Sequence, residues 1–182
     1  MKKIIKDVPN ALTLFRIALI PVLVFAFYFD GLLAHWVTAI IFIFASITDY
    51  IDGLIARRYD AHSNFGRMFD PIADKLLVGS TLMMLVHFDR APVIPCILIL
   101  CREITVSGLR EYLAEFKVSI PVSGLAKGKT AIQMVAIIIL LLGEKALPIP
   151  HLDNLGIAAL WFAAGLTLFT GYAYLKEGLK VG

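Results

Sequence analysis

The stretch DYIDGLIARRYDAHSNFGRMFDPIADK, residues 49–75, lies between two apolar segments and decides how the chain folds. It contains three arginines and, at regular spacing, Asp49, Asp52, Asp70 and Asp74. The flanking segments, residues 31–48 and 76–88, contain no Asp, Glu, Lys or Arg. Carboxylates next to such apolar segments are costly to bury. The four aspartates are therefore the first candidates for a functional site.

The rest of the chain has the composition of a membrane protein. Of its 182 residues, 59% are hydrophobic and 17% are charged, and several apolar runs approach the ~20 residues that span a bilayer. Glycine and proline mark several span ends, among them Gly31, Pro71 and Gly143. We predict an all-α integral membrane protein, a single domain over residues 1–182 in contact with membrane lipids. Its six spans are expected near residues 11–29, 33–52, 70–88, 91–112, 130–147 and 153–175.

The basic residues are distributed unevenly between the two ends of these spans. All of the 17 Lys and Arg residues except Arg90 and Lys145 fall at one end. An excess of Lys and Arg marks the cytoplasmic side, so we expect both termini and residues 49–75 to face the cytoplasm, as in a bacterial inner membrane. The net charge of +3 is modest, and basic residues that flank spans do not indicate nucleic-acid binding.

The spacing of the four aspartates places them in pairs on helix faces. Asp49 and Asp52 are three residues apart at the end of the second span, and Asp70 and Asp74 are four apart at the start of the third. A turn around Gly66 would bring the four carboxylates to one point. Crowded carboxylates repel one another and raise one another's pKa values unless a cation joins them.

Simpler interpretations account for part of this pattern. Asp70 followed by Pro71 is typical of a helix N-cap with proline at the first helical position. Ion pairs with the neighbouring arginines would account for one or two of the carboxylates. Asp49 and Asp52 resist the capping interpretation, because a carboxylate near a helix C-terminus opposes the macrodipole. Carboxylates without histidine or cysteine nearby favour Mg²⁺ or Mn²⁺ instead, and a pair of such ions stabilises both oxygens of a phosphoryl-type displacement.

The aspartates belong to a longer pattern that resembles the signature of the CDP-alcohol phosphotransferase family. The match runs through Asp49-x2-Asp52-Gly53-x2-Ala56-Arg57-x8-Gly66-x3-Asp70-x3-Asp74. Outer blocks are similar to the family as well, with one departure at Ala126, where the pattern has glycine. These blocks are PNALTLFR (9–16), TDYIDGLIARR (48–58), FDPIADKLLV (69–78), REITVSGLRE (102–111) and KGKTAIQMVA (127–136).

The resemblance implies transfer of a phosphatidyl or related group from a CDP-linked lipid to an alcohol, with release of CMP. It also implies six spans, a two-metal site and a homodimer. The outer blocks are most similar to members that use CDP-diacylglycerol and sn-glycerol 3-phosphate. By resemblance, Asp49, Asp52 and Asp70 bind the metals and Asp74 faces the second ion. The attacking hydroxyl must lose a proton, and Asp74, at the edge of the cluster, is our candidate general base.

Two further groups of residues are expected to bind the substrates. The candidates for the CDP-lipid lie at the start of the first span and within residues 49–75: Asn10, Thr13, Arg16, Gly53, Ala56, Arg57 and Gly66. Cations on the same side of the membrane are the candidates for the acceptor phosphate, with Glu103 and Glu111 expected to support the two arginines by ion pairing: Arg102, Arg110, Lys127 and Lys129. Arg110 is the preferred one, because its planar fork suits a bidentate phosphate contact.

Two other functions are compatible with the sequence. A sibling enzyme of the same family would use a different acceptor alcohol, such as inositol phosphate or serine. A cation-coupled transporter would also place carboxylates in a membrane. The clustering of the aspartates at one surface favours the enzyme, as does the absence of acidic residues from the fifth and sixth predicted spans except near their ends, at Glu144 and Asp153.

Overall fold

The computed structural model describes residues 2–59, 64–115 and 124–178, and side chains at 11–51, 69–113, 128–172 and 174–176. These ranges form helices, with no strand among the described residues. The helices are α1 (Lys2–Ala26), α2 (Gly31–Tyr59), α3 (Asn64–His87), α4 (Val93–Glu115), α5 (Gly124–Ala146) and α6 (Leu152–Gly178). The prediction of an all-α protein with six helices is confirmed.

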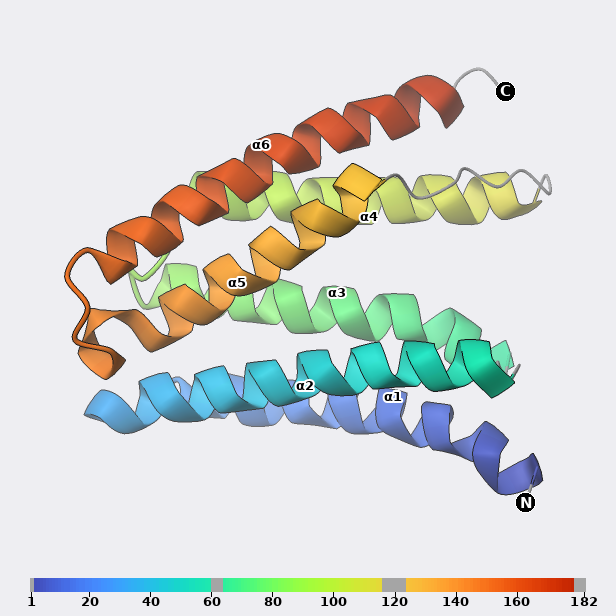
Figure 1. Cartoon of the computed structure of the whole chain (residues 1–182), viewed down its shortest axis with the longest axis horizontal. Helices are drawn as coiled ribbons and strands as arrows, with labels where there is room; N and C mark the ends of the chain where they lie inside the picture. The colour runs from blue at the N-terminus through green and yellow to red at the C-terminus, as the bar shows by residue number, and fades with distance from the viewer. Residues whose placement is uncertain (1, 60–63, 116–123, 179–182) are drawn as a thin grey trace. The chain divides into compact units, whose positions relative to one another are not determined.

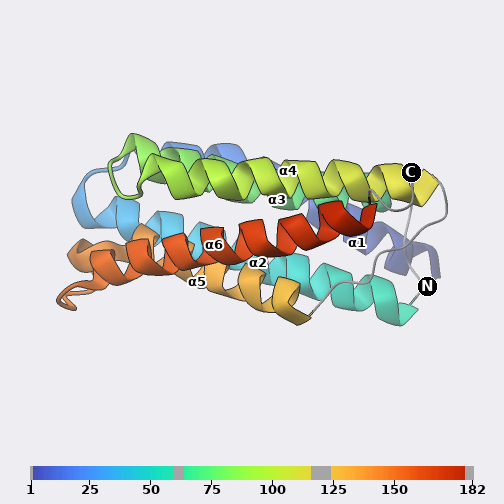
Figure 2. The same cartoon turned by 90° about the horizontal axis from the view of Figure 1, so that it is seen from above.

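The helices divide into two compact units, residues 1–84 and residues 85–182. In the first unit α1 packs along α2, and in the second α6 packs against both α4 and α5. Within each unit, successive helices run in opposite directions (Figures 1 and 2). That the chain forms a single domain stays a prediction.

The core of the first unit consists of apolar positions that recur at helical spacing. Leu23 of α1, Phe42 and Ala45 of α2, and Ala73 and Leu77 of α3 are each at most 1% exposed. A stripe of this kind on each helix buries apolar area at roughly 25 cal/mol per Å². Polar contacts connect α1 to α2 and α1 to α3 in the same unit.

The second unit has a similar core around α6. Ile99 of α4, Ile137 and Leu141 of α5, and Leu160 and Ala163 of α6 are completely buried. Because α6 contacts both neighbours, its side chains at one end can reach polar residues of α4.

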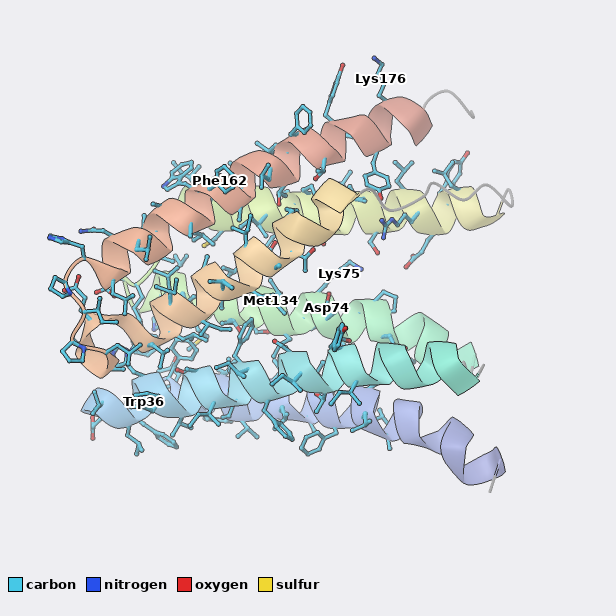
Figure 3. All side chains as sticks on the ribbon, viewed as in Figure 1. Trp36, Asp74, Lys75, Met134, Phe162 and Lys176 are labelled. Carbon is cyan, nitrogen blue, oxygen red and sulfur yellow. The ribbon has the colours of Figure 1, made fainter. Side chains whose placement is uncertain are left out.

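Apolar side chains also cover surfaces that no neighbouring helix buries. Ile40, Phe44 and Ile47 follow one face of α2 and are each at least 50% exposed, and Figure 3 shows Phe162 on the side of α6 away from α5. Among the described residues, Gly31–Ile51 and Leu152–Lys176 are long and apolar enough to cross a membrane. The number of spans and the side on which the termini lie stay predictions.

The helices extend beyond the predicted spans, and two local interpretations are wrong. Because α3 begins at Asn64, Asp70 and Pro71 lie inside the helix rather than at its N-cap. Gly66 is in the first turn of α3 and not in the connection between the helices. Hydropathy locates the apolar part of a helix, whereas the helix itself continues through polar residues until its hydrogen bonding ends.

Candidate active site

In the first unit, one group of polar residues forms what we call the aspartate cluster: Thr13, Arg16, Asp49 and Asp70. Thr13 and Arg16 are three residues apart on one face of α1, and both are completely buried. Asp49 lies near the C-terminal end of α2, and Asp70 lies in α3. The sequence predicted all four as site residues, and the fold brings them together from three helices.

Two polar contacts connect the helices in this cluster. The Arg16 Nη1 atom lies 2.6 Å from Asp49 Oδ1, and the Thr13 hydroxyl donates a short hydrogen bond to Asp70 Oδ1. Asp49 and Asp70 are close enough to repel each other electrostatically. The Asp49 side chain is 42% exposed although Arg16 is fully buried. The Asp49 carboxylate therefore contacts Arg16 on one side and is accessible to a ligand on the other.

Asp74 follows Asp70 by one helical turn on α3, so the two carboxylates share a face of that helix. Asp74 is half-buried, and its neighbour Ala73 is completely buried. Figure 3 shows Lys75 pointing to the side of α3 away from α2, and its ammonium donates to the Pro71 carbonyl at 2.9 Å. Lys75 is thus directed away from the face that α3 presents to α2.

No three acidic, histidine or cysteine side chains lie close enough to hold a metal ion among the side chains that the structure describes. The metal prediction at Asp52 lies outside those side chains. The same holds for five residues predicted to bind the CDP-lipid, whose helical backbone in α1, α2 and α3 is described but whose side chains are not: Asn10, Gly53, Ala56, Arg57 and Gly66.

The second unit contains another polar group, which we call the cationic cluster: Arg102, Glu103, Arg110, Lys129, Thr170 and Tyr174. Glu103 Oε1 accepts a hydrogen bond from Arg102 Nη1 at 2.9 Å and a short one from the Lys129 ammonium. The second guanidinium nitrogen of Arg102 donates to Thr170 Oγ1 at 3.2 Å. The prediction that Glu103 supports the cations by ion pairing is confirmed for Arg102, and Glu103 pairs with Lys129 as well.

Arg110 lies at the other end of this cluster, two helical turns beyond Arg102 on α4. Its Nη2 atom donates to the Tyr174 hydroxyl at 2.8 Å, and its guanidinium carbon lies 5.0 Å from the centre of the tyrosine ring. Arg110 is exposed, whereas the Lys129 side chain is only 3% exposed. Among the predicted phosphate ligands with described side chains, Arg110 is therefore the one that a solute reaches most directly.

The charges of the cationic cluster do not balance within it. It contains three cations and one carboxylate: Arg102 and Lys129 both contact Glu103, whereas Arg110 contacts the Tyr174 hydroxyl. Arg102 Nε is also buried without a hydrogen-bond partner among the described residues, whereas Nη1 and Nη2 each donate a hydrogen bond. An excess of positive charge with a spare donor is suited to an anion. Lys127 lies at the start of α5, and its side chain is outside those described.

The contribution of α6 was missing from the sequence-based site. Thr170 and Tyr174 lie four residues apart in a helix that was interpreted as an apolar span. Both are at most 5% exposed. Polar side chains on one face of an apolar span were the available signal, but only the fold shows that this face meets α4.

Comparison with known proteins extends the resemblance to almost the whole chain. The family model described as CDP-alcohol phosphatidyltransferase matches residues 6–169. A protein of Rickettsia felis named CDP-diacylglycerol–glycerol-3-phosphate 3-phosphatidyltransferase is 55% identical over 178 residues, which cover 98% of this chain and 98% of the relative.

More distant relatives carry the same kind of name. A protein of Pectobacterium atrosepticum with that name is 39% identical over 174 residues, 93% of each chain. The Arabidopsis thaliana protein named CDP-diacylglycerol–glycerol-3-phosphate 3-phosphatidyltransferase 2 is 39% identical over 187 residues, 95% of this chain and 80% of the relative. The prediction of the family is confirmed, and with it the prediction of a transferase.

Proposed function

Because this chain belongs to the CDP-alcohol phosphatidyltransferase family, we propose that it transfers the phosphatidyl group of CDP-diacylglycerol to sn-glycerol 3-phosphate. The products are phosphatidylglycerophosphate and CMP. The observation that carries this proposal is the 55% identity, over 98% of both chains, to a relative named for this reaction. The two charged clusters support it, because one offers carboxylates and the other offers cations in excess.

In the proposed reaction, the acceptor hydroxyl oxygen attacks the lipid-bearing phosphorus of CDP-diacylglycerol. The new P–O bond forms as the bond to the CMP oxygen breaks, and the hydroxyl proton passes to the carboxylate of Asp74. Arg16 and Thr13 are the described residues proposed to bind the diphosphate, together with Asn10 and Arg57. Gly53, Ala56 and Gly66 complete the proposed CDP-lipid site.

A divalent cation, Mg²⁺ or Mn²⁺, fits the residues of the aspartate cluster. Its donors are carboxylate oxygens, which these ions prefer, and Asp49 and Asp70 repel each other in a way that a cation relieves. We propose that Asp49, Asp52, Asp70 and Asp74 bind two such ions. When bound, the ions would neutralise charge on the diphosphate and on the departing CMP.

The acceptor phosphate is proposed to bind at the cationic cluster through Arg102, Arg110, Lys127 and Lys129. A phosphate monoester carries nearly two negative charges at neutral pH, which complements the excess of cations around Glu103. Arg110 would make the most direct contact because it is exposed. Lys129 is buried against Glu103, so it contributes charge and fixes that carboxylate.

We also propose the setting of the reaction. The enzyme is an integral membrane protein with its active site on the cytoplasmic face, in a bacterial inner membrane, and it acts as a homodimer. The two apolar segments that are long enough to span a bilayer support a membrane location. Residues 49–75 fall at the basic, cytoplasmic end of the predicted spans.

The test is an acceptor panel with the purified protein in detergent. Incubation with CDP-diacylglycerol, Mg²⁺ and one alcohol at a time should release CMP fastest with glycerol 3-phosphate. The panel contains inositol phosphate and serine as the sibling acceptors, and glycerol as a matched acceptor without phosphate. Chelation of the metal should stop turnover, and Mg²⁺ or Mn²⁺ should restore it. A preference for another acceptor would replace the proposed reaction, and the absence of CMP with every alcohol would exclude the enzyme.

A further inference from the structure

We propose that Tyr174 is a positioning residue for the acceptor phosphate, which orients Arg102 and Arg110 and thereby sets the preference for a phosphorylated acceptor. The inference rests on the proposed function, because it concerns the same cationic cluster. It adds a residue from α6, a helix that the sequence marks only as apolar. We argue it from the aromatic ring, the hydroxyl group and the glycine that precedes them.

The ring of Tyr174 is shared by two guanidinium groups. The guanidinium carbon of Arg110 lies 5.0 Å from the ring centroid and that of Arg102 lies 6.0 Å from it. Both distances fall within cation–π range. The two arginines are eight residues apart on α4, about 12 Å along the helix axis. Their side chains reach one ring only by converging, so the tyrosine determines where the two cations meet.

The hydroxyl of Tyr174 fixes the orientation of the outer arginine. It accepts a hydrogen bond from Arg110 Nη2 at 2.8 Å. Tyr174 is 5% exposed, so the surrounding helices restrict the movement of its ring. The exposed Arg110 would otherwise sample many rotamers, and ordering a long side chain costs conformational entropy. A preordered guanidinium avoids that cost when a phosphate binds.

Gly171 provides the room for the inner arginine. A Cβ atom at residue 171 would lie 2.9 Å from Arg102 Cγ and 3.5 Å from its Nε. Cγ is near the root of the side chain, so any other residue here would displace the whole arginine. Thr170, the residue before this glycine, accepts from Arg102 Nη2 at 3.2 Å. Thr170, Gly171 and Tyr174 thus form one face of α6 that receives both arginines.

One N–H donor of Arg102 is left without a described partner by these contacts, and it suggests that the site binds an anion. The Arg102 side chain is 9% exposed, and its Nε atom has no hydrogen-bond partner in the described part of the chain. A buried donor without a partner is costly in a finished protein core. It is explained if an anion completes the site. Arg102 and Arg110 can then both donate hydrogen bonds to the oxygens of one phosphate group.

The experiment compares substitutions of Tyr174 by steady-state kinetics with both substrates varied. Tyr174→Leu removes the ring and the hydroxyl, and it should raise the KM for glycerol 3-phosphate about tenfold. The KM for CDP-diacylglycerol should change less than about twofold. Tyr174→Phe keeps the ring and should recover most of the affinity for the acceptor. The matched control is Phe162→Leu, because Phe162 is an aromatic residue of the same helix that is 59% exposed and lies on the side of α6 away from α5 (Figure 3). It should change neither KM.

A second pair of variants addresses the geometry without touching Tyr174. Gly171→Ala should raise the KM for glycerol 3-phosphate by displacing Arg102. Gly165→Ala, on the same helix with no atom near the added Cβ, should leave it unchanged. Binding is measured independently of turnover by calorimetry with glycerol 3-phosphate, and Gly171→Ala and Tyr174→Leu should both weaken it.

The outcomes separate this inference from the proposed function. If the wild-type protein turns over glycerol 3-phosphate but Tyr174→Leu keeps its wild-type KM, the positioning role is wrong and the function stands. Equal losses for both substrates in Tyr174→Leu and Gly171→Ala would also overturn it, because they indicate general destabilisation. If the wild-type protein prefers an acceptor without phosphate, the proposed function itself fails.

Discussion

At the scale of single residues, the buried ion pair between Arg16 and Asp49 distinguishes two carboxylates that the sequence treats alike. Arg16 is completely buried and depends on Asp49, whereas Asp70 accepts from the neutral hydroxyl of Thr13. Removing the partner of a buried charge costs free energy of unfolding. A hydroxyl can donate to an amide oxygen as well as to a carboxylate.

The first prediction follows from this difference. Asp70→Asn and Asp49→Asn should each nearly abolish CMP release, because the amide lacks the charge that metal binding requires. Asp49→Asn should also lower the free energy of unfolding by about 1–3 kcal/mol, while Asp70→Asn leaves the unfolding temperature almost unchanged. Activity assays and thermal unfolding in detergent measure both effects. Wild-type turnover of either variant at saturating Mg²⁺ would remove that residue from the metal site.

The second prediction concerns Arg110. Replacing it with alanine removes a charge-assisted contact to the acceptor phosphate, worth about 1.5–3 kcal/mol, or roughly 10- to 150-fold in the KM for glycerol 3-phosphate. The KM for the CDP-lipid should not change. Lys176→Ala is the matched control, since Lys176 is exposed on α6 and Figure 3 shows it directed away from α5. A similar rise in both KM values would identify Arg110 as a structural residue.

Some residues of the site can be predicted from the sequence and others cannot. Asp49 and Asp70 were predictable because carboxylates beside apolar segments are costly to bury unless they have a function. Helical spacing also places each of them on a known face of its helix. Tyr174 was not, because a tyrosine in an apolar span is ordinary until its partner is known. Its role depends on two arginines of another helix, and that contact is set by packing of α4 on α6.

At the scale of secondary structure, α6 packs closely on α5 through Gly156. A Cβ atom there would lie 2.8 Å from Leu140 Cδ2 and 2.9 Å from Leu140 Cγ. Leu140 is 2% exposed and has little space to move. Small residues at helix contacts in membrane proteins allow this kind of approach.

The third prediction tests that contact. Gly156→Ala should destabilise the protein, because overpacking costs about 1–3 kcal/mol and exceeds the gain in helix propensity of up to about 1 kcal/mol. Gly165→Ala has the same propensity gain without the clash, so it should leave the protein unchanged or slightly more stable. Thermal unfolding of both variants in one detergent decides the matter. Equal stabilities would show that α5 and α6 separate easily at this point.

Helix ends were predicted with mixed success, for reasons that individual residues make clear. Gly31 begins α2 as expected, whereas Gly143, also expected at an end, lies at a kink inside α5; both have positive φ angles, 58° and 61°. These are angles that glycine adopts without strain. Pro71 was expected at an end and lies within α3. A proline costs a helix one hydrogen bond, and the packing of α3 outweighs this loss.

The connections at the other end of the second unit are held by side chains. Arg90 donates to the Leu141 carbonyl at 3.5 Å, next to the irregular Gly143, and Asp153 accepts from the Glu144 amide at 3.0 Å. Burial lowers the pKa of Arg90, and the nearby Asp153 opposes that shift. An arginine stays charged at physiological pH even so. These contacts satisfy backbone groups that the break in α5 exposes.

At the scale of the whole molecule, the distribution of charge predicts how the chain crosses the membrane. Arg90 and Lys145 lie at one end of the predicted spans and the other cations at the opposite end. The fourth prediction is that both termini are cytoplasmic. Green fluorescent protein fused to either terminus should fluoresce in bacteria, and alkaline phosphatase at the same positions should be inactive. Phosphatase inserted between Pro148 and Pro150 should be active. The reverse pattern would place the aspartate cluster on the outer face.

The last prediction concerns the course of the reaction. Direct transfer predicts sequential kinetics, because both substrates must be bound before the phosphatidyl group moves. The described serine closest to the aspartates along α2, Ser46, donates its hydroxyl to the Phe42 carbonyl at 2.7 Å. It is therefore committed to its own helix and is not an activated nucleophile. We expect the acceptor hydroxyl to attack the phosphorus itself.

A single in-line displacement inverts the configuration at phosphorus, whereas two displacements through a phosphatidyl-enzyme retain it. CDP-diacylglycerol that is chiral at the lipid-bearing phosphorus distinguishes the two by the stereochemistry of the product. Inversion is the expected result. Retention would require a covalent intermediate, and its nucleophile would be sought among the aspartates. Asp49 would be examined first, because its carboxylate is stabilised on one side by Arg16 and is 42% exposed.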